Sequence, residues 1–282
     1  MQELFELEWM GGAAEHHFRR ARPGIEELPW GTLDTSDYPP EIVDAARASW
    51  TESAYTEYRA VAAFAAVLRA MCEAKVPLDV VGMASSFVAD EVVHVELASR
   101  VAAELGGGVA RPVDFEQLCA YPSPELTPFQ RANELVLRVS CVAEAFSGKM
   151  AVSSLRATAH PLTRAVYERI VADESLHYRL GGVYFDWAEA ELDDAERARL
   201  AVVAQQALQG LGVVRRRRPA ATPDPHQAAR RRATPEQIAT LGWVPASSFA
   251  PDVAAAVRDG IAAPLAARGI VIPEEFLASL LA

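Results

Sequence analysis

Apolar residues recur with helical spacing over most of residues 41–211, and prolines and glycines interrupt this pattern. The pattern predicts an all-α fold in which four long helices share one core. These helices are expected from just after Pro40 to about Lys75, from Pro77 to the glycines at 106–108, from Thr127 to about Thr158, and from Pro161 to about Leu192. A further amphipathic helix is expected over residues 193–211.

The connection between the second and third predicted helices is unusually long. From Gly106 to Leu126 the chain has no helical period and contains Pro112, Pro122 and Pro124. A simple hairpin between neighbouring antiparallel helices does not need such a length. A long crossover instead lets the two helices run parallel, as in some four-helix bundles.

The segments outside residues 41–213 have a different character. Residues 1–40 contain Gly11-Gly12, Pro23-Gly24 and Pro39-Pro40, which predict an extended N-terminal arm with turns. Residues 214–233 form a basic linker with two arginine runs, expected either as a solvated loop or as a docking site for an acidic or phosphorylated partner. Residues 234–282 read as a C-terminal helical extension with helices opening at Thr234, near Asp252 and at Pro273.

The composition of the chain limits its possible partners and its cellular location. The net charge of −11 argues against nucleic acid as the partner of the whole surface. The three cysteines, Cys72, Cys119 and Cys141, are an odd number without a framework spacing, which favours reduced thiols. The first residues carry acid where a signal peptide needs base, and no apolar run reaches the roughly 18 residues of a membrane span. We therefore expect a cytoplasmic protein that does not enter a membrane.

Candidate chemistry lies at the polar positions within the apolar stripes. The pattern Val-Ala-Asp-Glu-x-x-His occurs at residues 88–94 and again at 171–177. Each copy places a glutamate and a histidine at i and i+3, on one face of a helix. In the second helix that face is otherwise apolar, with Phe87, Ala98 and Val101 beside the motif. A buried carboxylate is costly unless it is paired or coordinated, so the pattern predicts a bound cation.

The other two long helices contribute one glutamate each. Ser53 precedes Glu57 by four residues, and Ser140 precedes Glu144 by the same interval, which suggests an internal duplication. The candidate metal ligands are therefore Glu57, Glu91, His94, Glu144, Glu174 and His177. Hard carboxylate oxygens with one imidazole per metal suit iron or manganese better than a thiolate-bound zinc.

One glutamate from each of two helices, with a Glu-x-x-His motif from each of the other two, resembles the ferritin-like carboxylate bundle proteins. Over residues 41–213 the resemblance implies a ferritin-like four-helix bundle that holds two iron ions, with manganese or a mixed pair as alternatives. It also implies dioxygen as co-substrate, an electron donor or reductase, and a small organic substrate, free or carrier-bound. The expected activity is that of a non-haem di-iron oxygenase or oxidase that hydroxylates, N-oxygenates or desaturates this substrate. The alternative is a ferroxidase or iron-handling protein without an organic substrate. A homodimer is compatible with the pattern.

The resemblance assigns roles to further residues. Asp90 and Asp173 each precede a ligand glutamate, where family members have carboxylates that orient a ligand histidine. The alternative is that both are solvated. On the third helix, Cys141, Ser147 and Gly148 are small residues beside Glu144 and could leave room for substrate, although close helix packing at Gly148 is equally compatible.

Three departures narrow the choice of subfamily. Ala98 stands where radical-bearing ribonucleotide reductase subunits have tyrosine. Ser147 replaces the extra glutamate of rubrerythrins, although acyl-carrier-protein desaturases have a hydroxyl residue there. Ile170 replaces the additional histidine of arylamine N-oxygenases, so that subfamily matches only partly.

Overall fold

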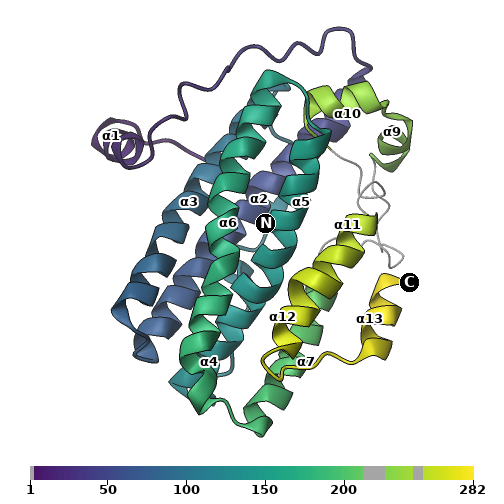
Figure 1. Ribbon diagram of the computed structural model, residues 1–282. Coiled ribbons are helices and arrows are strands. Elements are labelled where there is room, and N and C mark those ends of the chain that lie inside the picture. The colour runs from purple at the N-terminus through teal and green to yellow at the C-terminus, as the bar shows by residue number, and fades with distance from the viewer. Residues whose placement is uncertain (1–2, 212–225, 244–249) are drawn as a thin grey trace.

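The computed structural model describes residues 3–211, 226–243 and 250–282, which are predominantly helical (Figure 1). This agrees with the predicted all-α class. The first arginine run of the basic linker, Arg215–Arg218, lies outside the described residues. Among the described helices, none is both long enough and apolar enough to cross a membrane.

The four long helices are present close to their predicted bounds. They are α2 (Pro40–Glu73), α3 (Leu78–Glu104), a composite of α4 (Pro128–Val136), η2 (Leu137–Glu144) and α5 (Ala145–Ala157), and α6 (Pro161–Ala188). Local sequence explains where they begin, because Pro40, Pro128 and Pro161 occupy first-turn positions that need no backbone N–H. Thr127 caps α4 in a reciprocal capping box with Gln130.

The four helices pack in a ring around two clusters of buried apolar residues. Helix α2 contacts α3 and α4, while α6 contacts α3, η2 and α5. Large buried side chains from this ring fill its interior, among them Phe64, Phe87, Leu137 and Leu180. The bundle therefore has a closed apolar core into which side chains from all four members can point.

Cross-helix contacts give the directions of the helices. His94 on α3 lies next to Asp173 on α6, and His177 lies next to Asp90, so these two helices are antiparallel. Arg131 near the start of α4 pairs with Glu73 at the end of α2, so that pair is antiparallel too. It follows that α3 and the α4–η2–α5 composite run parallel. This confirms the role predicted for the long connection.

The connection itself carries two short elements, β2 (Pro112–Val113) and the 3-10 turn η1 (Phe115–Gln117). Strand β2 pairs antiparallel with β1 (Glu3–Leu4), with Glu3 opposite Val113. Phe5 then packs against the rings of Tyr55 and Tyr58 on α2. The start of the chain is thus attached to the outside of the bundle.

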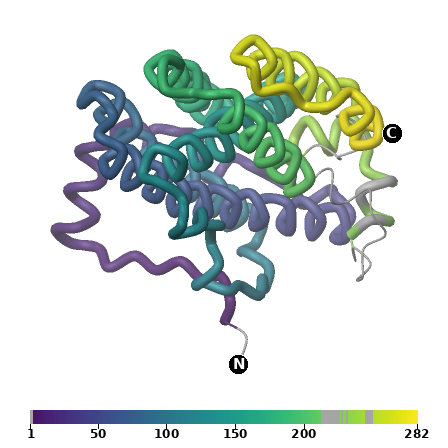
Figure 2. The backbone as a smooth tube through the Cα atoms, turned by 90° about the horizontal axis from the view of Figure 1, so that it is seen from below, coloured from purple at the N-terminus to yellow at the C-terminus, as the bar shows by residue number. Residues whose placement is uncertain are grey.

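The N-terminal arm, predicted to be mostly extended chain and turns, also contains a helix. Residues Gly12–Ala21 form helix α1, which lies beside α3, on the side of the bundle away from the C-terminal helices (Figures 1 and 2). None of its residues is buried. Phe18 packs, partly buried, against the core. The helix is short and follows directly on the turn signal Gly11-Gly12, which explains why the sequence pattern did not predict it.

The described helices that follow α6 pack outside the ring. They are η3 (Glu189–Glu191), α7 (Asp194–Gly210), α9 (Gln227–Arg232), α10 (Pro235–Leu241), α11 (Ala250–Ala255), η5 (Ala256–Ala262), α12 (Ala263–Ala266) and α13 (Glu274–Leu281). The predicted outer helix and the three openings in the extension are close to these bounds. The second arginine run of the linker is helical, in α9, rather than an open loop.

The C-terminal extension also closes one end of the bundle. The indole N–H of Trp50 donates to the carbonyl of Leu241 at 2.9 Å, and the Tyr167 hydroxyl donates to the carbonyl of Gly242 at 2.8 Å. Gly242 has a φ of +66°, and a β-carbon there would lie 2.7 Å from Thr163 Cβ. Only glycine allows this turn to approach the bundle so closely.

Candidate metal centre

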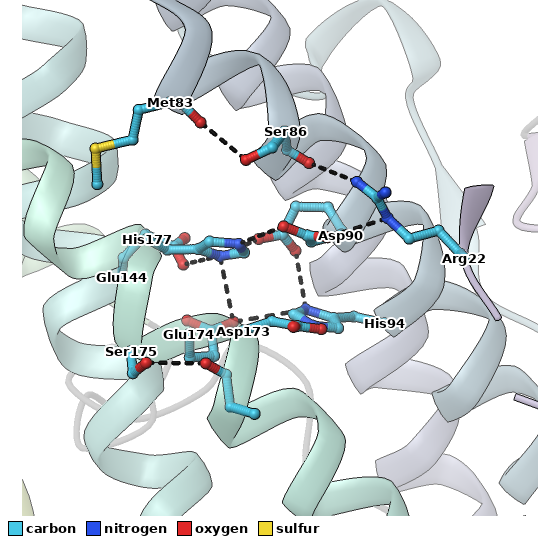
Figure 3. Close-up of polar contacts among 12 residues, drawn as sticks. Arg22, Met83, Ser86, Asp90, His94, Glu144, Asp173, Glu174, Ser175 and His177 are labelled. Atoms are coloured by element: carbon cyan, nitrogen blue, oxygen red, sulfur yellow. Dashed lines mark hydrogen bonds and ion pairs between the residues drawn. The ribbon is translucent and has the colours of Figure 1, made fainter. Parts of the chain in front are cut away.

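The six predicted ligands meet in the interior of the bundle, although they come from all four members of the ring. Figure 3 shows His94, Glu144, Glu174 and His177 of this cluster. Ligand atoms fall into two groups, each within 4.8 Å. The first group is Glu57, Glu91, His94 and Glu174, and the second is Glu91, Glu144, Glu174 and His177. Five of the six side chains are buried, and Glu57 is partly buried.

The histidines turn the same ring nitrogen toward the carboxylates. His177 Nδ1 lies 3.0 Å from Glu91 Oε1 and 3.5 Å from Glu144 Oε2. His94 Nδ1 lies 3.5 Å from Glu91 Oε2 and 3.6 Å from Glu174 Oε1. Nδ1 is therefore the nitrogen available for coordination in both residues, which the sequence could not specify.

Glu91 and Glu174 belong to both groups. Each Glu-x-x-His helix thus supplies one histidine to one group and one carboxylate to both. Glu57 completes the group around His94, and Glu144 completes the group around His177. The residues are arranged for two adjacent cations, each with its own imidazole and carboxylate and with two shared carboxylates between them.

Without cations, the crowded carboxylates are electrostatically unfavourable. Burial, followed by the charge of Glu91, raises the pKa of Glu57 well above its usual value and also raises the pKa of Glu144. Burial and the neighbouring Glu144 raise the pKa of Glu174 in the same way. The three groups favour protonation because negative charge in the apolar core lacks sufficient compensation.

The pKa values of the two histidines are also raised, which favours their positively charged form. Burial favours neutral imidazole, but hydrogen bonds to Asp90, Glu144 and Glu91 outweigh it and raise the pKa of His177 to about 12. The pKa of His94 is likewise well above its usual value, because Asp173 and Glu91 outweigh burial. In the metal-free protein, imidazolium protons thus occupy the place that positive metal ions would take.

Several buried polar atoms of the cluster lack a hydrogen-bond partner. They are both carboxylate oxygens of Glu91, one oxygen each of Glu144 and Glu174, Nδ1 of His94, and both ring nitrogens of His177. Such orphaned groups are rare in folded proteins, and several meeting at one point call for an explanation. Two divalent cations would satisfy these atoms and would balance the charge of the four carboxylates. The donor set therefore fits a two-metal centre.

The outer nitrogens of the histidines face the two motif aspartates, in a crossed arrangement. His94 on α3 has its Nε2 3.3 Å from Asp173 on α6, whereas His177 on α6 has its Nε2 3.6 Å from Asp90 on α3. Each aspartate therefore lies next to the candidate ligand histidine of the opposite helix, through a hydrogen bond for Asp173 and a longer ion-pair contact for Asp90. An orienting role for both stays a prediction. They are not simply solvated residues.

Apolar rings cover the outer side of the second group. The ring centroid of Phe87 lies 4.4 Å from that of His177, and that of Phe64 lies 5.3 Å away. Both phenylalanines are fully buried. They keep water from His177 on this side and restrict how its ring can turn.

The three residues predicted to line a substrate pocket make packing contacts. Cys141 fits against Gly181 on α6, where a β-carbon would overlap its sulfur. The Ser147 hydroxyl donates to the carbonyl of Glu144 at 3.3 Å, within its own helix. Gly148 faces Glu174, whose Cβ would lie 3.7 Å from an added β-carbon. The last contact agrees with the packing alternative. Substrate binding at these residues stays a prediction.

Two features of the site were not predicted. Glu144 ends η2, a π-helical segment that begins at Leu137, and π-helical turns are often found at functional sites. Two arginines also contact the motif aspartates: Arg169 pairs with Asp173 at 2.9 Å, and Arg22 pairs with Asp90 at 3.1 Å. A basic residue four positions before Asp173 could have been noticed in the sequence, whereas nothing in it connects Arg22 with Asp90.

Comparisons with models of protein families, with curated proteins and with solved structures found no match to this chain. The functional argument therefore rests on the geometry of the six residues and their surroundings.

Proposed function

We propose that this chain is a ferritin-like two-metal protein and acts as a non-haem di-iron oxygenase or oxidase on a small organic substrate. The observation that carries the proposal is the pair of overlapping ligand groups that share Glu91 and Glu174. Two bridging carboxylates between two imidazole-bearing positions suit a pair of iron or manganese ions. When bound, iron would supply the electrons needed to activate dioxygen.

The protein's own residues have separate tasks in this proposal. Glu57 and Glu144 would each hold one ion, and Glu91 and Glu174 would be shared between the two. Asp173 hydrogen-bonds to Nε2 of His94, and Asp90 faces Nε2 of His177 at 3.6 Å, so that Nδ1 of each histidine is left to coordinate. Phe64 and Phe87 exclude water from one side, which limits unproductive reactions of an oxidising centre.

The oriented histidines favour a catalyst over an iron-handling protein. An iron store must release its metal, so rigid support of both ligand histidines offers it little. Here each histidine has an aspartate behind it, and each aspartate has an arginine. Such supporting contacts typically strengthen metal binding 10- to 100-fold, which suits ions that stay in place during turnover.

Metal loading and iron oxidation test the proposal. Under anaerobic conditions the protein should bind two equivalents of Fe(II), and Glu91→Ala should lose at least one because it removes a shared carboxylate. Thr56→Ala is a matched control, because its hydroxyl bonds only within its own helix, next to Glu57. Binding of one equivalent or none by the wild-type protein would refute the two-metal centre.

Exposure to dioxygen then separates the two functions. A catalyst should oxidise its two bound irons once, retain them, and repeat the reaction only after chemical reduction. A ferroxidase should go on oxidising added Fe(II) beyond two equivalents while ferric product leaves the site. Continued iron oxidation without added reductant would overturn the oxygenase proposal in favour of iron handling. Product analysis with candidate substrates would then identify the reaction.

A further inference from the structure

The two halves of the metal centre are supported in different ways. Behind His94, Asp173 is held by Arg169, which lies four residues earlier on the same helix. Behind His177, Asp90 is held by Arg22, which comes from the N-terminal segment, just after α1 (Figure 3). One half is thus complete within the bundle, whereas the other depends on a segment that lies outside it.

Arg22 makes more than one contact with α3. Its Nε lies 3.1 Å from Asp90 Oδ1, and its Nη2 donates to the carbonyl oxygen of Ser86 at 3.1 Å. Ser86 precedes Asp90 by one helical turn, so the guanidinium spans the turn that leads to the metal-binding residues. The Nε–Asp90 contact is an ion pair rather than an aligned hydrogen bond. With only 16 % of its side chain exposed, Asp90 has little water to replace this partner.

A second arginine anchors the same helix further along α3. Arg19 donates from Nη1 to both oxygens of Glu96, at 2.5 and 2.7 Å, and Glu96 is only 4 % exposed. Asp90 and Glu96 stand on either side of the Glu91–His94 motif. Helix α1 therefore docks by two charged contacts that flank the ligands of α3, and it buries no side chain of its own.

We propose that docking of residues 12–22 onto α3 is energetically coupled to occupancy of the ion beside His177. Arg22 is the positioning residue: it holds Asp90, Asp90 orients the His177 ring, and the ring presents Nδ1 to the ion. By linkage, if docking of this segment strengthens metal binding, metal binding must strengthen docking by the same factor. This inference assumes the two-metal centre proposed above.

Metal titration of arginine variants tests the first half of the coupling. With Co(II) as an anaerobic probe, Arg22→Gln should lower the affinity for one of the two ions by about 5-fold or more. This is the lower end of the usual coupling between two binding sites. Arg22→Lys should restore part of the affinity because it keeps the charge. Arg169→Gln is the matched comparison, and it should instead lower the affinity for the ion beside His94.

Variants of the ligands identify which ion responds. In a His94→Ala background, Arg22→Gln should still lower the affinity for the remaining ion. In a His177→Ala background, it should have no further effect. Equal effects in both backgrounds, with reduced thermal stability of the metal-free protein, would show that Arg22 has a general structural role and would overturn the proposal.

Hydrogen exchange tests the reciprocal half and needs no turnover. In the wild-type protein, Co(II) should slow amide exchange across residues 12–22. The protection should disappear in Arg22→Gln and in His177→Ala, yet persist in Arg169→Gln. Metal binding without any change in exchange across α1 would refute the coupling while leaving the metal centre intact. A wild-type protein that binds no Co(II) would instead refute the proposed function.

Discussion

The contact between Cys141 and Gly181 sets the spacing of two helices that carry metal ligands, and it offers a sharp test of the packing. Cys141 lies one turn before Glu144, and Gly181 lies one turn after His177. A β-carbon at position 181 would overlap the Cys141 sulfur and would come within 3.4 Å of its backbone nitrogen. Because the cysteine is short and enclosed, its sulfur cannot simply swing into solvent. Gly181→Ala should therefore push η2 and α6 apart.

The expected magnitude is a difference between two opposing effects. Replacing a mid-helix glycine with alanine stabilises a helix by about 0.5–1 kcal/mol. Overpacking a close helix contact typically costs about 1–3 kcal/mol. The adjacent Gly182 provides the control, since its nearest neighbour across the interface is Arg268 Nη2 at 3.8 Å, an ordinary contact with the end of a flexible side chain. Gly182→Ala should gain the helix stabilisation without the overpacking.

Thermal and urea unfolding of the metal-free variants measures this difference. Gly181→Ala should be less stable than Gly182→Ala by about 1–3 kcal/mol, or about 2–4 °C in Tm for each kcal/mol. Cys141→Ala should relieve the overlap, so the double variant Cys141→Ala/Gly181→Ala should recover most of the loss relative to Cys141→Ala alone. If Gly181→Ala and Gly182→Ala are equally stable, the two helices are not held together through this contact, and the reasoning fails.

Three further predictions concern the metal centre. Asp90→Asn and Asp173→Asn should keep the fold but weaken metal binding about 10- to 100-fold, as measured by competition with a chelator, and unchanged affinity in both would contradict their orienting role. The pKa of His177 is raised to about 12, so its proton must leave when metal binds. The apparent metal affinity should therefore rise from about pH 6 to about pH 9. Calorimetry in buffers of different ionisation enthalpy should detect the released proton. Gly148→Ala should retain two metals because its β-carbon meets Glu174 at an ordinary distance, whereas Gly148→Leu should lower the measured metal content by displacing that ligand.

Much of the bundle could be predicted because its helices are governed by local signals. Prolines at helix starts, the Thr127 capping box and long apolar stripes all act within a few residues, so they can be read from the sequence directly. The clustering of Glu57, Glu91, His94, Glu144, Glu174 and His177 could be predicted for a related reason, since charged groups within apolar stripes are costly to bury unless they meet partners. The length of the connection between α3 and α4 permitted a parallel arrangement of the two helices but did not require it.

Other features depend on contacts between distant parts of the chain. Helix α1 is stabilised on the bundle by Arg19 and Arg22, whose partners lie about 70 residues away in sequence. The π-helical segment at Glu144 carries no residue pattern of its own, because helical propensity does not distinguish the two hydrogen-bond registers. Exposed helices held by charge, and local changes of register, are therefore the parts that sequence periodicity misses.

The crossed pairing of aspartates and histidines shows how two equal motifs acquire unequal surroundings. Because α3 and α6 are antiparallel, the residue before each shared glutamate faces the histidine of the other helix, and the pairing is symmetric: Asp173 with His94, and Asp90 with His177. The symmetry does not extend to the arginines that pair with these aspartates. On α6 the supporting arginine comes from the previous turn, but the corresponding position on α3 is Ser86, which offers only its backbone carbonyl. Arg22 from the N-terminal segment makes the ion pair with Asp90 that Arg169 makes with Asp173 on the other helix. Ser86→Arg should therefore make metal affinity less sensitive to Arg22→Gln. If the double variant binds metal as weakly as Arg22→Gln alone, an arginine at position 86 cannot replace Arg22, and the two halves are not interchangeable.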